Sequence, residues 1–372
     1  MIRKLIGFFF VALFIAAPLS PAHADPVIVR IVGPAHQTFT GEFRNDDLAQ
    51  ELTPSGRLGQ LVYVPVSQSK IWVIDPALID EVSAMMGEYK LATNATPAGS
   101  QIASSWLSQL QKVSKNNDVV ALAYGNPDVA LAKSLAPSEL KMYYTFGKSQ
   151  LQLALMRMVR SEPAGNWSTG KSKLSAPLRK NYSDSRKALT RLSRVVNSYD
   201  LMIMRAQLGR LLSPTLDKDG RSYFSFSAKT AVEKEVHRLR INGGKYQVTT
   251  ESAKLPVTIV NQFPFAVTVN VEMLPMNSRV IVDSFTGINV AANSKKQLEL
   301  NLSVIAPGET TIFAQITDSR GLAVVPQSIL QINSTVIDKR VTWFTTGAAI
   351  LLLLAAVAQS VRRVRKGRSN EN

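Results

Sequence analysis

The chain begins and ends with an apolar run, and the two runs differ in length and in their flanking residues. The first spans residues 5–19, follows Arg3 and Lys4, and is interrupted by Pro18. The triplet Ala22-His23-Ala24 supplies a small-x-small cleavage site. This arrangement predicts a signal peptide over residues 1–24 that is removed after Ala24, and it indicates that the chain from Asp25 onward is exported.

The second run, residues 341–361, contains no charged side chain and has the length that a helix needs to cross the hydrocarbon core of a membrane. Five basic residues follow it directly: Arg362, Arg363, Arg365, Lys366 and Arg368. Positive charge is retained on the cytoplasmic side of a span, so residues 362–372 are expected to form a cytoplasmic tail. We therefore predict a single-pass cell-membrane protein of type I topology with an extracytoplasmic N-terminal part.

Between these runs, the first part of the chain alternates strand-like and helix-like patterns. After a β-branched run at residues 27–32, a strand followed by a helix is predicted three times: residues 71–74 then 77–86, 119–124 then 129–135, and 142–146 then 150–159. A further amphipathic helix is predicted over residues 104–113. Strands that alternate with helices indicate a parallel sheet, so residues 25–212 are expected to form an α/β domain.

A helical stripe of apolar residues runs from Leu189 to Ala206 and predicts one long helix. Basic side chains lie mostly on its other sides: Arg186, Lys187, Arg191, Arg194, Arg205 and Arg210. Residues 213–239 are expected to be a linker. The basic face is a candidate binding surface, and the alternative is an ordinary solvated face of a helix.

From Lys245 onward the apolar positions recur every second residue, as in Leu298, Leu300, Leu302 and Val304. Turn residues punctuate this region at intervals typical of a β-sandwich. Residues 240–335 are therefore predicted to form an immunoglobulin-like β-sandwich next to the membrane helix.

Composition narrows the partners. The 372 residues carry a formal net charge of +16 and include no cysteine. The absence of cysteine excludes disulfides, thiolate metal sites and cysteine nucleophiles. A cysteine-free exported protein is typical of a bacterial envelope. The excess positive charge lies between residues 141 and 221. Outside the cytoplasm the expected partners are an anionic cell-wall polymer or lipid headgroups, and nucleic acid is not expected.

Two carboxylates stand at the predicted strand ends. Asp75 and Asp128, with Tyr124 nearby, would lie at the edge of a parallel sheet where ligands bind, and they are the candidate catalytic residues of a glycan site. The alternative is structural. Asp75 and Asn126 each precede a proline and have the pattern of helix N-caps, and Asp128 would then complement the dipole of the first turn.

Metal and cofactor chemistry has little support in the sequence. His23 leaves with the signal peptide, and His36 and His237 are isolated and are expected to be surface or loop residues. The nucleophile-elbow, P-loop and dinucleotide fingerprints are absent from the sequence. We expect no metal and no cofactor.

Four segments taken in order resemble an uncharacterised family of actinobacterial membrane-anchored envelope proteins that are often encoded near a lipid II flippase. The segments are residues 55–59 (SGRLG), 72–78 (WVIDPAL), 123–129 (AYGNPDV) and 255–261 (LPVTIVN). The resemblance implies a signal peptide, an α/β region similar to the barrel of polysaccharide deacetylases, an immunoglobulin-like module and one C-terminal span. This chain has Asn126 where the family tends to have Asp, and its α/β segment is short for a complete barrel of about 250 residues.

The expected fold is thus an α/β domain, partial or degenerate and barrel-like, followed by an immunoglobulin-like β-sandwich and a transmembrane helix. The first functional hypothesis is a non-enzymatic binding or scaffold protein in cell-wall assembly, with a membrane protein such as a lipid II flippase as a further partner. The alternative is a glycan-active hydrolase or a deacetylase-like enzyme that uses Asp75, Asp128 and Tyr124. A third hypothesis is a purely structural subunit that binds its complex through the membrane helix.

Overall fold

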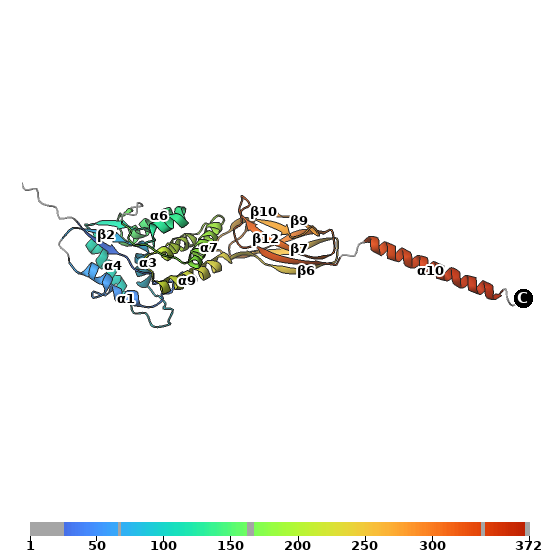
Figure 1. Cartoon of the computed structure of the whole chain (residues 1–372), viewed down its shortest axis with the longest axis horizontal. Coiled ribbons are helices and arrows are strands. Elements are labelled where there is room, and N and C mark those ends of the chain that lie inside the picture. The colour runs from blue at the N-terminus through green and yellow to red at the C-terminus, as the bar shows by residue number, and fades with distance from the viewer. Residues whose placement is uncertain (1–25, 66–67, 162–166, 336–338, 369–372) are drawn as a thin grey trace, which may run out of the picture.

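The computed structural model describes residues 26–65, 68–161, 167–335 and 339–368. The expected signal peptide, residues 1–24, lies outside this part of the chain. An α/β unit, a β-sandwich and a long C-terminal helix follow one another along the molecule, with the sandwich between the other two (Figure 1).

The α/β unit contains a four-stranded sheet in the order β1-β2-β3-β4, and every pair in it is parallel. The side chain of Trp72 in the second strand is buried between neighbours Val29 and Val119 in register. The strands and the helices of this unit are β1 (Val27–Ile31), α1 (Asp47–Leu52), α2 (Arg57–Tyr63), β2 (Lys70–Ile74), α3 (Pro76–Met85), α4 (Ser100–Ser114), β3 (Asp118–Ala121), α5 (Val129–Leu135), α6 (Pro137–Leu155) and β4 (Arg160–Ser161). The predicted alternation of strands and helices in a parallel sheet is present.

The strand of the third predicted repeat is wrong. Residues 142–146, expected as a strand, are helical and form the single helix α6 together with residues 150–155 of the helix that was predicted over 150–159. Its buried positions include Leu140, Tyr143, Gly147 and Leu151, which follow the helical spacing of three or four residues. The strand that extends the sheet beyond β3 is instead the short β4, which follows this helix.

The long basic helix is also corrected. The segment folds as α7 (Ala176–Leu192), α8 (Tyr199–Gln207) and the 3₁₀ helix η1 (Leu208–Leu212). Ser198 begins the second helix by accepting a hydrogen bond from Asp200 N at 3.2 Å. The apolar stripe continued across the break because Val196, which lies in the turn, is buried as well.

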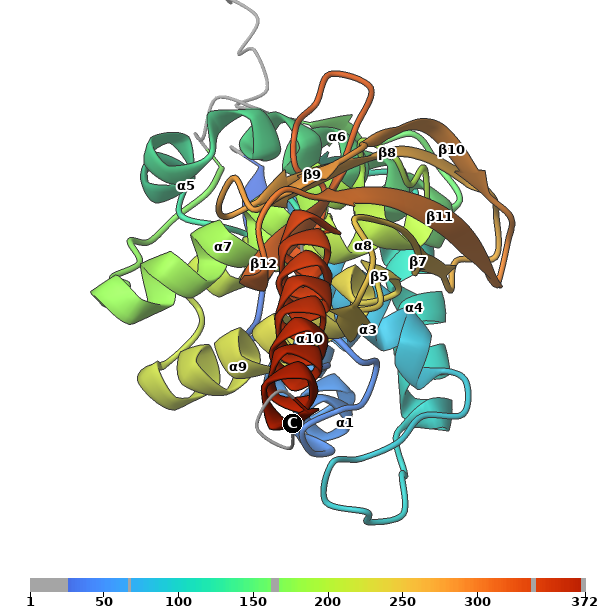
Figure 2. The ribbon, with the colours of Figure 1, turned by 90° about the vertical axis from the view of Figure 1, so that its right-hand side faces the viewer.

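Residues 213–239, expected as a linker, contain the helix α9 (Lys218–Val236). Asp217 caps it through Gly220 N at 2.7 Å. Many of the buried positions on this helix are small, such as Ser225, Ala228 and Ala231, so the segment lacks a strong apolar stripe. It packs beside α7 in both views (Figures 1 and 2).

The sandwich consists of two facing sheets with the strand orders β10-β8-β12-β13-β6 and β5-β7-β11-β9. Burial alternates along its long strands, as the period of two predicted. All of its pairs are antiparallel except β13 with β6. The strands are β5 (Leu239–Ile241), β6 (Gly244–Val248), β7 (Ser252–Asn261), β8 (Val267–Pro275), β9 (Val280–Val282), β10 (Phe285–Val290), β11 (Ser294–Val304), β12 (Gly308–Thr317) and β13 (Ser328–Ser334).

The helices and the sandwich share one hydrophobic cluster, which includes Phe224 and Val236 of α9 and Leu239 of β5. Arg238 lies at this junction: its guanidinium stacks on the Phe263 ring with 4.4 Å to the centroid and donates to Gln262 O at 2.8 Å. The two parts are therefore joined by packed side chains as well as by the chain.

The C-terminal helix α10 (Lys339–Arg368) contains the predicted span of residues 341–361. Within it, residues 346–363 have a mean hydropathy of 1.3 and none of them is buried against the rest of the protein. Among the described residues this is the one helix long and apolar enough to cross a membrane. These properties are consistent with a single-pass anchor.

Candidate functional site

The three predicted catalytic residues all lie at the carboxyl-terminal edge of the parallel sheet. Asp75 follows β2, whereas Tyr124 and Asp128 follow β3. All three are buried, with exposed fractions of 3%, 2% and 8%. The hydrogen bonds of each side chain show what it does there.

Asp75 is the N-cap of α3. Its Oδ1 accepts from Ala77 N at 3.0 Å and from Gly125 N at 2.9 Å. Gly125 has a φ of +79°, a conformation that favours glycine. Burial raises the pKa of the Asp75 carboxyl to about 7, against the two backbone hydrogen bonds, which lower it. This carboxylate therefore joins the sheet edge to a helix start.

Asp128 is the N-cap of α5, which corrects the expected cap at Asn126. The helix begins at Val129, and Asp128 Oδ1 accepts from Ala130 N at 3.0 Å and Leu131 N at 3.1 Å. Its Oδ2 accepts from Ser172 N at 2.8 Å. Asn126 has a φ of +44° and lies in the tight turn before the cap, so it does not begin the helix.

Tyr124 contacts a different carboxylate. Its hydroxyl donates to Asp80 Oδ2 at 2.9 Å, and its ring packs edge-on against Phe146. Burial raises the pKa of Tyr124 well above its usual value, and burial also raises the pKa of Asp80 to about 6. The predicted trio thus shares an edge of the sheet, but its members bond to separate partners.

The sequence did not single out the most connected group at this edge, which is Glu81. Its carboxylate accepts from the backbone N of His36 and of Gln37, each at 3.0 Å, and lies 3.1 Å from His36 Nδ1. The guanidinium of Arg210 donates to Glu81 and, at 2.7 Å, to Gln37 O. Burial alone would raise the pKa of Glu81, but Arg210 and the His36 hydrogen bond lower it below the usual value.

This network refines one prediction and corrects another. His36, expected as a surface or loop residue, lies in the loop after β1 and is buried against Glu81, whereas His237 is exposed as expected. Arg210 was expected on the exposed basic face, yet it is only 4% exposed. The spacing of these residues, from position 36 to position 210, gives no local signal in the sequence.

The segment η1 fills the edge of the sheet. Asp128 N donates to Leu212 O at 2.9 Å, and a Cβ added to Gly125 would lie 2.6 Å from Arg210 N, so the backbones are in direct contact. The cavity that remains beside Asp75, Gly125 and Arg210 measures about 10 Å³. That is room for at most one water molecule and not for a sugar.

No cluster of three or more His, Asp or Glu side chains that would suit a metal ion is found in the described part of the chain.

The predicted basic face divides into exposed and buried members. Lys187, Arg191 and Arg194 are exposed, while Arg186 and Arg205 are half-buried. Arg205 pairs with the buried Glu139, with Nη2 2.8 Å from Oε1. These pairs use two of the six predicted residues, Arg205 and Arg210, to hold elements together.

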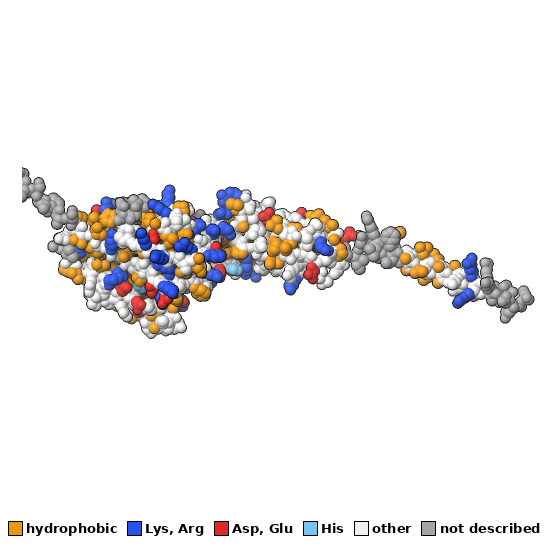
Figure 3. Space-filling model, in the orientation of Figure 1, with side chains coloured by type: hydrophobic (Ala, Val, Ile, Leu, Met, Phe, Trp, Pro, Cys, Tyr) orange, Lys and Arg blue, Asp and Glu red, His pale blue; other side chains and the backbone are white. Residues whose placement is uncertain are grey.

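The exposed cations form a stripe that we call the basic surface: Lys180, Lys187, Arg191, Arg194 and Arg320. Arg320 belongs to the loop after β12, and Asp318 links it to Arg194 at distances of 3.2 Å and 3.8 Å. Figure 3 shows lysine and arginine side chains gathered over the α7 side of the helices and at their border with the sandwich. The stripe therefore crosses from the helices to the sandwich.

Residues 145–370 match the model of a family of unknown function, DUF6049. The chain belongs to this family. The match confirms that the chain is a member of an uncharacterised family, while the actinobacterial origin and the neighbouring flippase stay predictions. No match is found among curated proteins.

Several solved structures resemble the chain over about a quarter of its length. They include WR4, a C. elegans MSP family member (15% identity, 26% of this chain and 98% of that chain, TM-score 0.21). The CARDB domain of PF1109 from Pyrococcus furiosus has 16% identity, covers 27% and 92% of the two chains, and has a TM-score of 0.20. The ASH/PapD-like domain of human CEP192 has 10% identity, 27% and 87% coverage and a TM-score of 0.22. At these scores none of them carries an argument about function.

The DUF6049 match begins within α6 and includes α7, the basic surface, the sandwich and α10. Asp75, Glu81 and Asp128 lie before it. Arg210 lies within the matched residues.

Proposed function

We propose that this DUF6049 protein is a membrane-anchored, non-enzymatic binding protein that holds an anionic polymer of the cell envelope against its basic surface during wall assembly. The observation that carries the proposal is the run of exposed cations Lys180, Lys187, Arg191, Arg194 and Arg320. Clustered positive charge raises the local concentration of a polyanion and accelerates its association.

The filled sheet edge supports a non-enzymatic role over the glycan hydrolase or deacetylase. An acid and a base must reach the same bond of a substrate. Here Asp75 and Asp128 are helix N-caps that each accept two or more backbone N–H groups, Arg210 lies beside Asp75, and Leu212 of the same segment η1 is bonded to Asp128 N.

A wall polymer fits the basic surface better than the headgroups of the protein's own membrane. The sandwich lies between the helices and α10 (Figure 1), and its strand β11 has 11 residues, which corresponds to about 35 Å. Attraction between charges falls off over about 8 Å at physiological ionic strength. The basic surface lies at the end of the sandwich away from α10, so we expect its partner to lie there and not at the membrane surface.

In this proposal α10 is the anchor, residues 26–335 lie outside the cytoplasm, and the C-terminal end lies inside it. The apolar character of residues 346–363 supports an anchor, and the basic residues after the run support the orientation. A membrane protein such as a lipid II flippase would then contact the protein through or beside α10.

Reversing two charges on the basic surface is expected to weaken binding to a purified poly(glycerol phosphate) wall polymer by at least about tenfold. Lys187→Glu with Arg191→Glu changes two exposed residues of α7, and each basic residue near an anionic surface contributes about 1 kcal/mol. Binding of the full chain in uncharged nanodiscs is measured by interferometry at low and high salt.

The matched control is Lys112→Glu with Lys115→Glu, which changes the net charge equally at the end of α4 and is expected to leave the affinity nearly unchanged. Equal losses in both pairs, or binding that does not depend on salt, would refute a specific role for the basic surface.

A further inference from the structure

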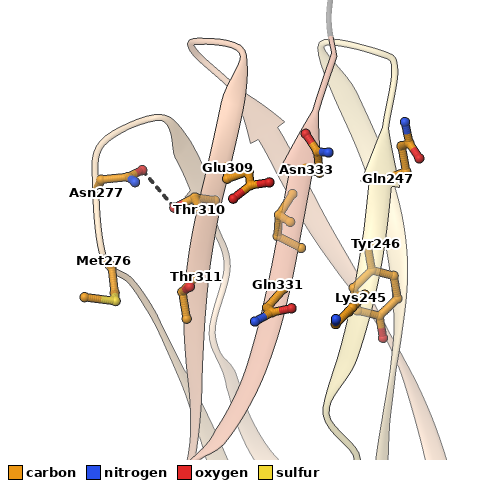
Figure 4. A pocket seen from close by; sticks show the side chains of 11 residues that line it. Lys245, Tyr246, Gln247, Met276, Asn277, Glu309, Thr310, Thr311, Gln331 and Asn333 are labelled. Atoms are coloured by element: carbon orange, nitrogen blue, oxygen red, sulfur yellow. Dashed lines mark hydrogen bonds between the residues drawn. The ribbon is translucent and has the colours of Figure 1, made fainter.

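The sandwich carries a second candidate binding site, a cleft of about 630 Å³ on the outward face of the sheet β10-β8-β12-β13-β6 (Figure 4). It extends over β12, β13 and β6, near the end of β13 that leads to α10. None of its lining residues belongs to the basic surface, so a role for this cleft does not rest on the proposed function.

The strand register arranges the floor of the cleft as two rows of polar side chains. In β12, β13 and β6 the aligned positions are Thr311, Gln331 and Lys245 in one row and Glu309, Asn333 and Gln247 in the other. Aligned residues point to the same face, and positions two apart along a strand do so as well. Figure 4 shows the two rows one above the other. From the usual spacings of about 4.8 Å between strands and about 3.4 Å between residues, they cover about 10 Å by 7 Å.

These six side chains can form many hydrogen bonds and together carry no net charge. Two glutamines, an asparagine and a threonine each donate and accept, and the charges of Lys245 and Glu309 cancel. Within the described residues, none of the six side chains forms a hydrogen bond or an ion pair with the protein. Their donors and acceptors are therefore available to a ligand.

The rim of the cleft adds apolar surface. Met276 is 64% exposed at one side, where its backbone N is bonded to Thr311 O at 2.9 Å. Tyr246 alternates with Lys245 and Gln247 and is in register with the buried Ile332, so its side chain points away from the two polar rows, and its hydroxyl donates to Pro256 O of β7 at 2.7 Å. A ligand that fits has many donors and acceptors, little charge, and C–H groups for the rim.

We propose that this cleft binds a short neutral glycan. A hydroxyl-rich sugar matches side chains that both donate and accept, and it has apolar C–H faces for the exposed Met276. A polyanion has no cationic excess to attract it here. An extended peptide adds to a free strand edge, but β12 and β13 are each paired on both sides, so it could add only along the outer edge of β6 and not over the two polar rows.

The test uses the full chain in nanodiscs of phosphatidylcholine and three neutral trisaccharides: maltotriose, cellotriose and tri-N-acetylchitotriose. At least one is expected to bind by saturation-transfer NMR and calorimetry. Replacing Gln331 and Asn333 together by alanine is expected to weaken that binding by about tenfold or more, because each amide supplies up to two or three hydrogen bonds. Failure of all three sugars to bind would overturn the proposal.

The control pair is Gln297→Ala with Asn301→Ala, which removes two exposed amides from the outward face of β11 in the opposite sheet. Equal affinity of the two double variants would also overturn the proposal. Circular dichroism confirms that both fold.

A further arm separates a free glycan from the sugar headgroup of a membrane lipid. The sugar that binds is presented on a diacylglycerol in the same nanodisc. Tighter binding to the lipid-borne sugar than to the free one identifies a headgroup, and equal or weaker binding identifies a free glycan; either result supports the cleft as the site.

Discussion

Replacing Arg210 with methionine is expected to lower the free energy of unfolding by about 3–5 kcal/mol, because it leaves the buried Glu81 carboxylate without its cation. The same change removes the hydrogen bond to Gln37 O. Unfolding by urea is followed through Trp72 and Trp106, which are both buried in the α/β unit.

Two further variants test whether the loss of stability in Arg210→Met comes from the unpaired Glu81 carboxylate. Arg191→Met removes an exposed guanidinium from α7 and is expected to change the stability by less than about 0.5 kcal/mol. Combining Glu81→Gln with Arg210→Met is expected to recover part of the loss, because the glutamine oxygen still accepts from the backbone of His36 and Gln37 and no buried charge is left unpaired. A loss below about 1 kcal/mol for Arg210→Met alone would show that the ion pair does not hold η1 in the sheet edge.

The order of elements was predictable wherever one period of apolar residues dominated. The alternation in β11 (Ser294–Val304) and the strand-to-helix unit around Asp75 were both predicted and are both present. Prediction from the period was wrong at two places. Val196 is buried in the turn between α7 and α8, so the apolar pattern continues where the helix does not. In α9 the buried face contains small residues such as Ala228 and Ala231, so no strong apolar pattern marks the helix. A local pattern reports burial and does not report the turn between two buried helices.

The candidate site was predictable only in part, for a similar reason. The edge of a parallel sheet is set by local sequence, so Asp75, Tyr124 and Asp128 were correctly placed there. The edge is filled by Arg210, which pairs with Glu81. The two residues are far apart in the sequence, and no periodic pattern connects them. The cleft on the sandwich could not be predicted from the sequence. Its residues follow the same alternating pattern as those of any strand with a solvent-exposed face, and only the register between strands brings them together.

The stability of the protein is expected to fall as the pH rises from about 5 to about 8, chiefly because of Asp75. Burial raises the pKa of this carboxyl to about 7, from 3.8 in the unfolded chain. Between these two pKa values the folded state retains a proton that the unfolded state has released, so raising the pH through this range favours unfolding. Asp80, whose pKa burial raises to about 6, acts in the same direction, while Glu81, with its lowered pKa, is ionised in both states and adds no slope.

Asp75→Asn is therefore expected to be more stable than the wild type at pH 8, with a ceiling of about 4 kcal/mol, and to show a shallower dependence on pH. The amide oxygen retains both acceptor contacts, to Ala77 N and Gly125 N, but carries no charge to bury. Urea unfolding at pH 5 and pH 8 measures the difference.

Asp75→Ala is the informative comparison, because it removes the charge and the cap together. It is expected to lose about 0.5–2 kcal/mol relative to Asp75→Asn at both pH values, the usual contribution of an N-cap. Equal stabilities for the alanine and asparagine variants would mean that the cap contributes nothing. A wild-type stability that is constant between pH 5 and pH 8 would mean that the carboxyl at this edge is hydrated, and the edge would then be open rather than filled by η1.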